Sequence, residues 1–149
     1  MMSIVYEIGI TEKNNKAIEK KQSIEVIASK GIVGDRYFHD FNGDREQITL
    51  IESENIDYYN KTFNTEFDYL DFRRNLVTKN LRLNDLVGKT IIVGEIRLKV
   101  NDLCRPCKNL QNRLGKNNII KEFLKRGGLR CEILSSGTIN VGDKIILKT

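Results

Sequence analysis

The sequence predicts a mostly β fold, a closed or nearly closed barrel with a few short helices. Most periodic segments alternate apolar and polar residues, as Ile96, Leu98 and Val100 do with Arg97 and Lys99. Short connections centred on glycine separate these segments, and only two segments have helical periodicity. Closing a sheet of many short strands removes its exposed edges, so a barrel is the expected architecture.

The expected elements follow from these patterns in chain order. Strands are predicted at Ile4 to Ile10, Ser23 to Val26, Gln47 to Ile51, Asn75 to Thr78, Thr90 to Val93, Ile96 to Val100, Leu129 to Leu134 and Lys144 to Leu147. Thr90 to Val100 is expected to be a hairpin, because Gly94 supplies the positive φ that a tight turn needs. One helix is predicted to begin near Ser53 as its N-cap, and another to run from Asn118 to Lys125 before Gly127-Gly128.

Composition limits the class of protein. The 149 residues suit one domain spanning 1–149, and 40% hydrophobic with 30% charged residues is typical of a globular chain. No apolar run is long enough to span a bilayer, and the first ten residues lack the basic start of a signal peptide, so a cytoplasmic location is expected. The net charge of +5 favours an anionic partner, either a small phosphorylated ligand or nucleic acid.

Cys104 and Cys107 are the first candidates for chemistry. With three cysteines and one histidine, the chain offers poor material for a four-ligand zinc site, and a thioredoxin-like pair would need a βαβ context that the pattern lacks. Cys131 lies in an apolar strand and is expected to be a core residue. Two structural thiols in a loop remain an alternative. Cys107 is nevertheless the better nucleophile or soft-metal ligand, because Arg105 and Lys108 would favour its thiolate and Pro106 stiffens the loop.

A second cluster surrounds Gly31 to Asp40. Its glycines and Asp35 suggest a tight loop that another segment approaches closely, and Arg36 follows directly. His39 is the sole histidine and a candidate acid or base, although a lone histidine in a polar loop is more often ordinary surface. Arg45 and Gln47 open the next strand on one face, where they could hold an anion or fix a loop.

A third cluster is Arg73-Arg74-Asn75 at the entrance to a strand. Two neighbouring guanidinium groups can bind a phosphate or carboxylate with forked donors. The alternative is an ordinary solvated pair of charges.

Taken in order along nearly the whole chain, these pieces resemble the MOSC domain, the C-terminal domain of molybdenum cofactor sulfurases. The matching pieces are the Gly31 to Arg36 loop, Arg45 to Leu50, Arg73 to Val77, Leu86-Val87-Gly88, Gly94-Glu95, Cys104-Arg105-Pro106-Cys107, and Arg126 to Leu129 through Gly142-Asp143. The ordered set, which includes a cysteine after a hairpin, is more specific than any single piece.

The resemblance implies a barrel of the MOSC type, similar to that of pyruvate kinase, with one functional cysteine matching Cys107. It implies molybdenum cofactor (molybdopterin) as the bound group, with Cys107 as its molybdenum ligand. The residues expected to bind the anionic pterin are Asp35, Arg36, His39, Arg45, Arg73, Arg74 and Asn75. Pyridoxal phosphate is not expected, since the chain has no room for the aminotransferase-like domain of the larger relatives.

Two molybdenum-related functions follow from the resemblance. Cys107 either ligates molybdenum in a reductase of N-hydroxylated or related compounds, which needs an electron-donor protein, or carries sulfur as a persulfide, which needs a sulfur-donor protein. A non-enzymatic binding or carrier module for molybdenum cofactor or another anionic ligand is the alternative. Nucleic acid is disfavoured, because aromatic residues do not interleave with the basic ones.

Overall fold

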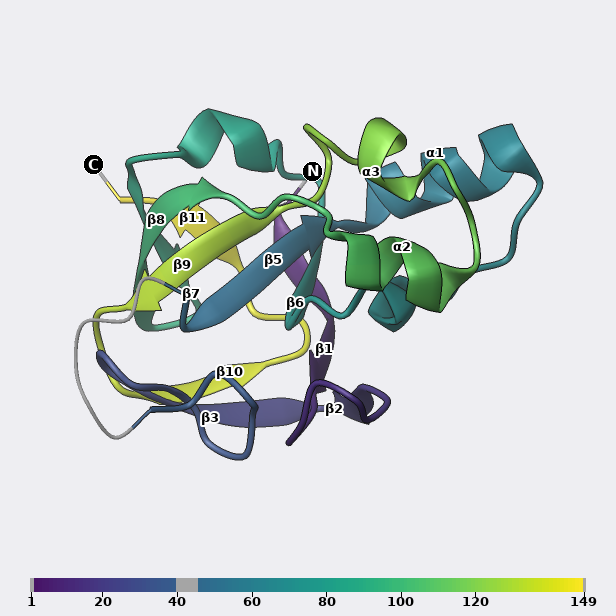
Figure 1. Ribbon diagram of the computed structural model, residues 1–149. Coiled ribbons are helices and arrows are strands. Elements are labelled where there is room, and N and C mark those ends of the chain that lie inside the picture. Colours follow the sequence, from purple (N-terminus) through teal and green to yellow (C-terminus); the bar gives the residue numbers. More distant parts are fainter. Residues whose placement is uncertain (1, 40–45, 149) are drawn as a thin grey trace.

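The computed structural model describes residues 2–39 and 46–148, and strands dominate it (Figure 1). The strands are β1 (Ile4–Ile10), β2 (Glu19–Lys21), β3 (Ser23–Ile27), β4 (Gly31–Ile32), β5 (Ile48–Glu52), β6 (Leu76–Lys79), β7 (Thr90–Val93), β8 (Ile96–Leu103), β9 (Leu129–Ile133), β10 (Gly137–Asn140) and β11 (Ile145–Leu147). The helices are α1 (Ser53–Phe63), α2 (Lys108–Leu114) and α3 (Ile119–Glu122), with 3₁₀ turns η1 (Tyr69–Phe72) and η2 (Leu83–Leu86).

Eight strands form one curled sheet in the order β11-β7-β8-β9-β5-β6-β1-β2. All neighbours are antiparallel except β5 and β6, which are parallel and joined through α1. The segment before β11 returns to β1, where Ile4 bridges Lys144 and the Val5 amide donates to the Asp143 carbonyl at 2.9 Å. The sheet therefore curls into a half-barrel in which the segment before β11 contacts β1. The prediction of a mostly β, barrel-like fold is confirmed.

A smaller sheet of β10, β3 and β4 lies beside the main sheet. The three helices gather on one side of the main sheet (Figure 1). The alternating positions of the strands fill the barrel interior, as Ile96, Leu98 and Val100 do. A second apolar cluster joins the helices to the outside of the sheet through Ile56 and Phe123. No helix in the described part of the chain is long and apolar enough to cross a membrane.

The predicted strands are present with small shifts at their ends, and the β7–β8 hairpin turns at Gly94 with φ 61°. α1 begins at Ser53 as predicted, but Glu52 occupies the capping position and no side chain caps the helix. The helix expected from Asn118 to Lys125 shortens to α3, because the backbone leaves helical geometry at Phe123, with φ −104° and ψ 12°. The pattern also missed α2, β2, β4 and β10.

Gly127 and Gly128, expected to stop a helix, instead let two segments approach one another. A Cβ on Gly128 would lie 1.7 Å from the Leu50 carbonyl oxygen, and a Cβ on Gly127 would lie 2.2 Å from the Cys104 carbonyl oxygen. Only hydrogen atoms fit at these two positions, so the pair fixes how β9 begins against β5 and the end of β8.

We expect Gly128→Ala to destabilise the fold strongly. Its φ of +98° costs a side chain about 1–2 kcal/mol, and relieving the clash with Leu50 adds about 1–3 kcal/mol. Gly88→Ala is the matched control, because Gly88 has φ +82° with nothing within 4 Å of its added Cβ, so only the first cost applies. Urea unfolding of both variants measures the difference; equal losses of unfolding free energy would contradict the close approach.

Candidate functional site

The loop between β8 and α2 turns its two cysteines to opposite sides. The Cys104 amide donates to the Gly128 carbonyl at 2.8 Å, and the Cys104 side chain is buried. Pro106 is also buried, whereas Cys107 is exposed and stands at the start of α2. Burial raises the pKa of the Cys104 thiol above its ordinary value, and it does so more strongly for Cys131, which is fully enclosed in β9. Cys107 is therefore the accessible thiol of the three.

Cys107 opens onto a cleft of about 730 Å³ built from four separate parts of the chain. The loop after β1, the loop after β4, the turn before β6 and the α2 region each contribute. The lining residues are Asn14, Asn15, Arg36, Tyr37, Arg73, Arg74, Cys107, Asn109, Leu110, Asn112 and Arg113.

This cleft is strongly positive. Four of its lining residues are arginines, and none of the described residues that line it is Asp or Glu. The arginines lie close enough to influence one another: burial, followed by the charges of Arg113 and Arg36, lowers the pKa of Arg73. Such a cluster of like charges in a recess favours an anionic ligand.

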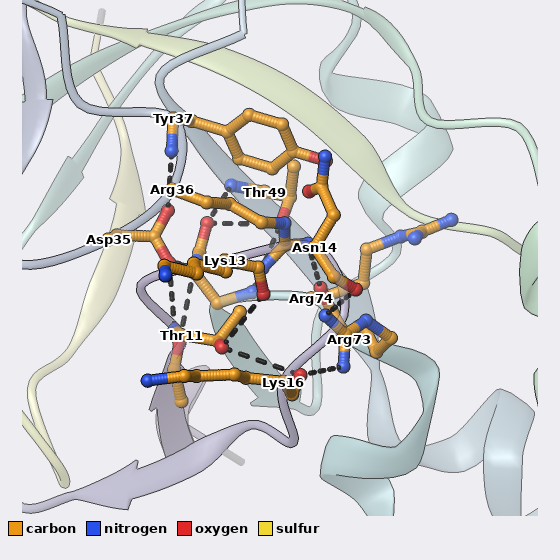
Figure 2. A network of polar contacts seen from close by, with 12 residues as sticks. Thr11, Lys13, Asn14, Lys16, Asp35, Arg36, Tyr37, Thr49, Arg73 and Arg74 are labelled. Atoms are coloured by element: carbon orange, nitrogen blue, oxygen red, sulfur yellow. Dashed lines mark hydrogen bonds and ion pairs between the residues drawn. The ribbon is translucent and has the colours of Figure 1, made fainter.

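Arg73 and Arg74 hold the two rims of the cleft. Arg73 donates from Nη1 to the Lys16 carbonyl at 2.7 Å and from Nη2 to the Asn14 carbonyl at 2.9 Å. Arg74 turns the other way and donates from Nε to the Gly127 carbonyl at 2.8 Å. The backbone of Arg73 is left-handed, with φ 65°, so the two consecutive side chains diverge. Figure 2 shows Arg73 directed at the loop that carries Asn14 and Lys16.

Arg36 differs from these two because one of its donors has no partner. Its side chain is 8% exposed, and Nη2 donates to the Arg73 carbonyl at 3.1 Å. Nη1 is buried without a hydrogen bond, 3.9 Å from Asp35 Oδ1, while the guanidinium lies 4.4 Å from the centre of the Tyr37 ring (Figure 2). A buried N–H without a hydrogen-bond acceptor is costly, so this donor of Arg36 is a candidate for contact with an oxyanion.

Asp35 and Asn75 lie behind the cleft and do not line it. Asp35 accepts the Thr11 amide at 3.1 Å and the Tyr37 amide at 3.3 Å. Asn75 accepts the Thr49 amide at 3.0 Å and donates to the Gly9 carbonyl at 3.1 Å. Both side chains are buried, and their contacts within the protein hold the Arg36 loop and β6 against β1.

The other predicted site residues lie elsewhere. His39 is half-buried and does not line the cleft, and Arg45 lies outside the described residues. Gln47 is buried, and its side chain accepts the Ile133 amide at 2.8 Å, so it joins β5 to β9. Over residues 2–39 and 46–148, no three His, Cys, Asp or Glu side chains converge as metal ligands.

Residues 38–146 match the sequence profile of the MOSC domain. This chain belongs to the MOSC domain family. No curated protein matches it in a sequence comparison. The MOSC family is associated with molybdenum-cofactor proteins, as the resemblance of the motifs implied.

Solved structures share the fold of this MOSC chain. YuaD from Bacillus subtilis is 16% identical, with a TM-score of 0.83 over 97% of this chain and 94% of YuaD. YiiM from Geobacillus stearothermophilus is 16% identical, with a TM-score of 0.80 over 99% of this chain and 75% of that one. YiiM from Escherichia coli is 19% identical, with a TM-score of 0.73 over 99% of this chain and 68% of that one.

The sequence did not reveal every part of the cleft. Asn14, Asn15 and Arg113 belong to it, and Arg113 donates to the Asn14 carbonyl at 2.9 Å. One available signal for α2 was the spacing of Leu110 and Leu114 followed by Gly115, which predicts a short helix with a glycine cap. The loop that carries Asn14 has no comparable signal.

We expect limiting iodoacetamide to alkylate Cys107 first in the folded protein. Cys104 and Cys131 are buried with raised pKa values, so at a given pH fewer of their thiols are ionised than in the unfolded chain. Peptide mass spectrometry over a range of pH measures the order. In urea the three should react at similar rates, and earlier labelling of Cys104 in the folded state would contradict the assignment.

Proposed function

We propose that this MOSC protein binds molybdenum cofactor in the arginine cleft, with Cys107 as the thiolate ligand of the metal. The observation that carries the proposal is the placement of an exposed thiol in a recess lined by four arginines. A soft thiolate suits molybdenum, and a positive recess suits the phosphate of a pterin.

The residues present fit such a group. Arg36 has a donor without a hydrogen bond. Arg113, Asn109 and Asn112 also line the cleft. These residues would hold the anionic part, and Cys107 would hold the metal. When bound, the cofactor would supply two-electron redox chemistry, and an N-hydroxylated or related compound is the substrate class we propose. An electron-donor protein is the partner that this function needs.

A second function, persulfide sulfur carrier, is favoured by the exposure of Cys107. Its thiolate would attack the outer sulfur of a donor persulfide, and the cysteine of the donor would leave as a thiolate. This function needs an accessible thiol and a sulfur-donor protein, and it does not need a resident metal.

Purification from a host that makes molybdenum cofactor tests the metal-ligand proposal. The protein should carry molybdenum and pterin in stoichiometric amounts, Cys107→Ser should lose molybdenum, and Cys104→Ser should retain it. Elemental analysis and pterin fluorescence are the measurements. A metal-free protein whose Cys107 carries sulfane sulfur would favour the sulfur carrier. Full molybdenum and pterin in Cys107→Ser would leave a non-enzymatic carrier module.

Arg36→Gln should weaken the binding of a phosphorylated pterin, because it removes the charge and the donor that has no hydrogen bond within the protein. Losing one charge-assisted hydrogen bond costs about 1.5–3 kcal/mol, which is about a tenfold to hundredfold rise in Kd. Arg82→Gln is the control: it removes the same charge from a side chain that is 88% exposed and outside the cleft. Fluorescence titration measures both, and equal affinities in the two folded variants would remove Arg36 from the anion site.

A further inference from the structure

We propose that Arg74 is a positioning residue for Cys107, acting through the carbonyl groups of Cys104 and Gly127. This inference rests on the role proposed for Cys107. Arg74 was expected to contact the anion directly, because it lies beside Arg73 in the sequence. Its hydrogen bonds assign it a different task, which is to hold the loop that carries the thiol.

The guanidinium of Arg74 joins three segments of the chain. Nε donates to the Gly127 carbonyl at 2.8 Å, Nη2 to the Cys104 carbonyl at 3.4 Å, and Nη1 to the Phe72 carbonyl at 3.3 Å. The side chain is buried, so each of these donors needs an acceptor within the protein. The three nitrogens of a guanidinium spread its donors over a planar fork, and the single nitrogen of a lysine cannot reproduce that arrangement.

Gly127 shows how closely the loop is held. A Cβ at this position would lie 2.2 Å from the Cys104 carbonyl oxygen and 3.3 Å from Pro106 Cδ. The Cys104 amide is fixed as well, since it donates to the Gly128 carbonyl. Both polar groups of the Cys104 backbone therefore have partners, on Arg74 and on the start of β9.

The restraint on the Cys104 backbone reaches Cys107 because the connection between them is short and stiff. Pro106 is buried, and its ring fixes its own φ and restricts Arg105 before it. Beyond Cys107, α2 begins at once, and the Cys107 carbonyl accepts the Gln111 amide at 3.1 Å. The thiol thus lies between a clamped segment and a helix, which sets its distance from the arginines of the cleft.

The position of the thiol determines the electric potential that it experiences. The field of the cleft decays over about 8 Å in physiological salt, so a thiol on a loop that moves away loses attraction for anionic reagents. This attraction is measurable as the ratio of the alkylation rates of Cys107 with anionic iodoacetate and neutral iodoacetamide. The fraction of ionised thiol cancels in that ratio. Comparison with the same ratio for a cysteine in an unstructured peptide removes the intrinsic difference between the two reagents and reports the potential at the sulfur.

Arg74→Lys is the first test, because it keeps the charge and removes the fork. The rate ratio at Cys107 should exceed that of a cysteine in an unstructured peptide, and Arg74→Lys should lower it at least about threefold. Gly127→Ala should lower it too by a separate route, because the new Cβ displaces the Cys104 carbonyl from Arg74. In both variants the buried Cys104 should also become easier to label.

Arg130→Lys is the matched control. Arg130 also ties the end of β8 to the start of β9, through hydrogen bonds to Asp102 at 3.0 and 2.6 Å, but it does not bond the Cys104 carbonyl. Its ratio should stay near that of the unmodified protein.

An unchanged rate ratio in folded Arg74→Lys and Gly127→Ala would overturn the proposal, and so would an equal fall in Arg130→Lys. If Arg74→Lys does not unfold in a cooperative thermal transition, the rate ratio at Cys107 in Gly127→Ala decides between the outcomes. The assay needs no molybdenum. A protein that never binds the metal, but whose rate ratio falls in these variants, would refute the proposed function and support the positioning role of Arg74.

Discussion

The cleft depends on a single kink in the backbone, the left-handed residue Arg73, which separates two buried guanidinium groups. A buried guanidinium must find acceptors for its donors, and here the acceptors are main-chain carbonyls on opposite sides. Arg73 donates hydrogen bonds to the loop after β1, and Arg74 donates hydrogen bonds to the chain just after β8 and just before β9. These segments are far apart in sequence and become the two rims of one recess because adjacent side chains point in opposite directions.

Carbonyl acceptors satisfy the donors of these arginines without cancelling their charge. A carboxylate partner would have done both, but no Asp or Glu of the described chain lines the cleft, and Asp35 lies behind it, 3.9 Å from Arg36 Nη1. The same hydrogen bonds that stabilise the rims thus leave a positive field in the opening. Burial lowers the pKa of Arg73, and the neighbouring charges of Arg113 and Arg36 lower it further, which is consistent with a concentration of positive charge here. The side chains that stabilise the rims are therefore also the source of the positive charge, and among the described residues Arg36 contributes a buried donor without a hydrogen bond.

Local pattern predicted most of the fold, but not the hydrogen-bond partners of the arginines. Strands such as β1 and β8 alternate clearly, whereas β2 is three polar residues and β10 begins at a glycine, so neither has a period-two signal. Cys107, the thiol that the sequence favours for chemistry, is exposed, and Cys104 is buried. The acceptors of Arg73 lie 57 and 59 residues away, and those of Arg74 include carbonyls 30 and 53 residues away. Nothing in a local pattern specifies such partners, which exist only once the barrel has closed.

The two cysteines of the loop are chemically unequal because the fold treats them differently. Cys104 is enclosed, its carbonyl is held by Arg74, and burial raises its pKa, while Cys107 faces solvent beside the arginines. Two thiols three residues apart usually suggest a redox pair, but a pair works best when both members can reach a partner. The likeness to YuaD and YiiM, at 16–19% identity, establishes the fold alone. In this chain, burial, the hydrogen bonds to the Cys104 carbonyl and the distribution of charge therefore distinguish one exposed thiol at a cationic recess.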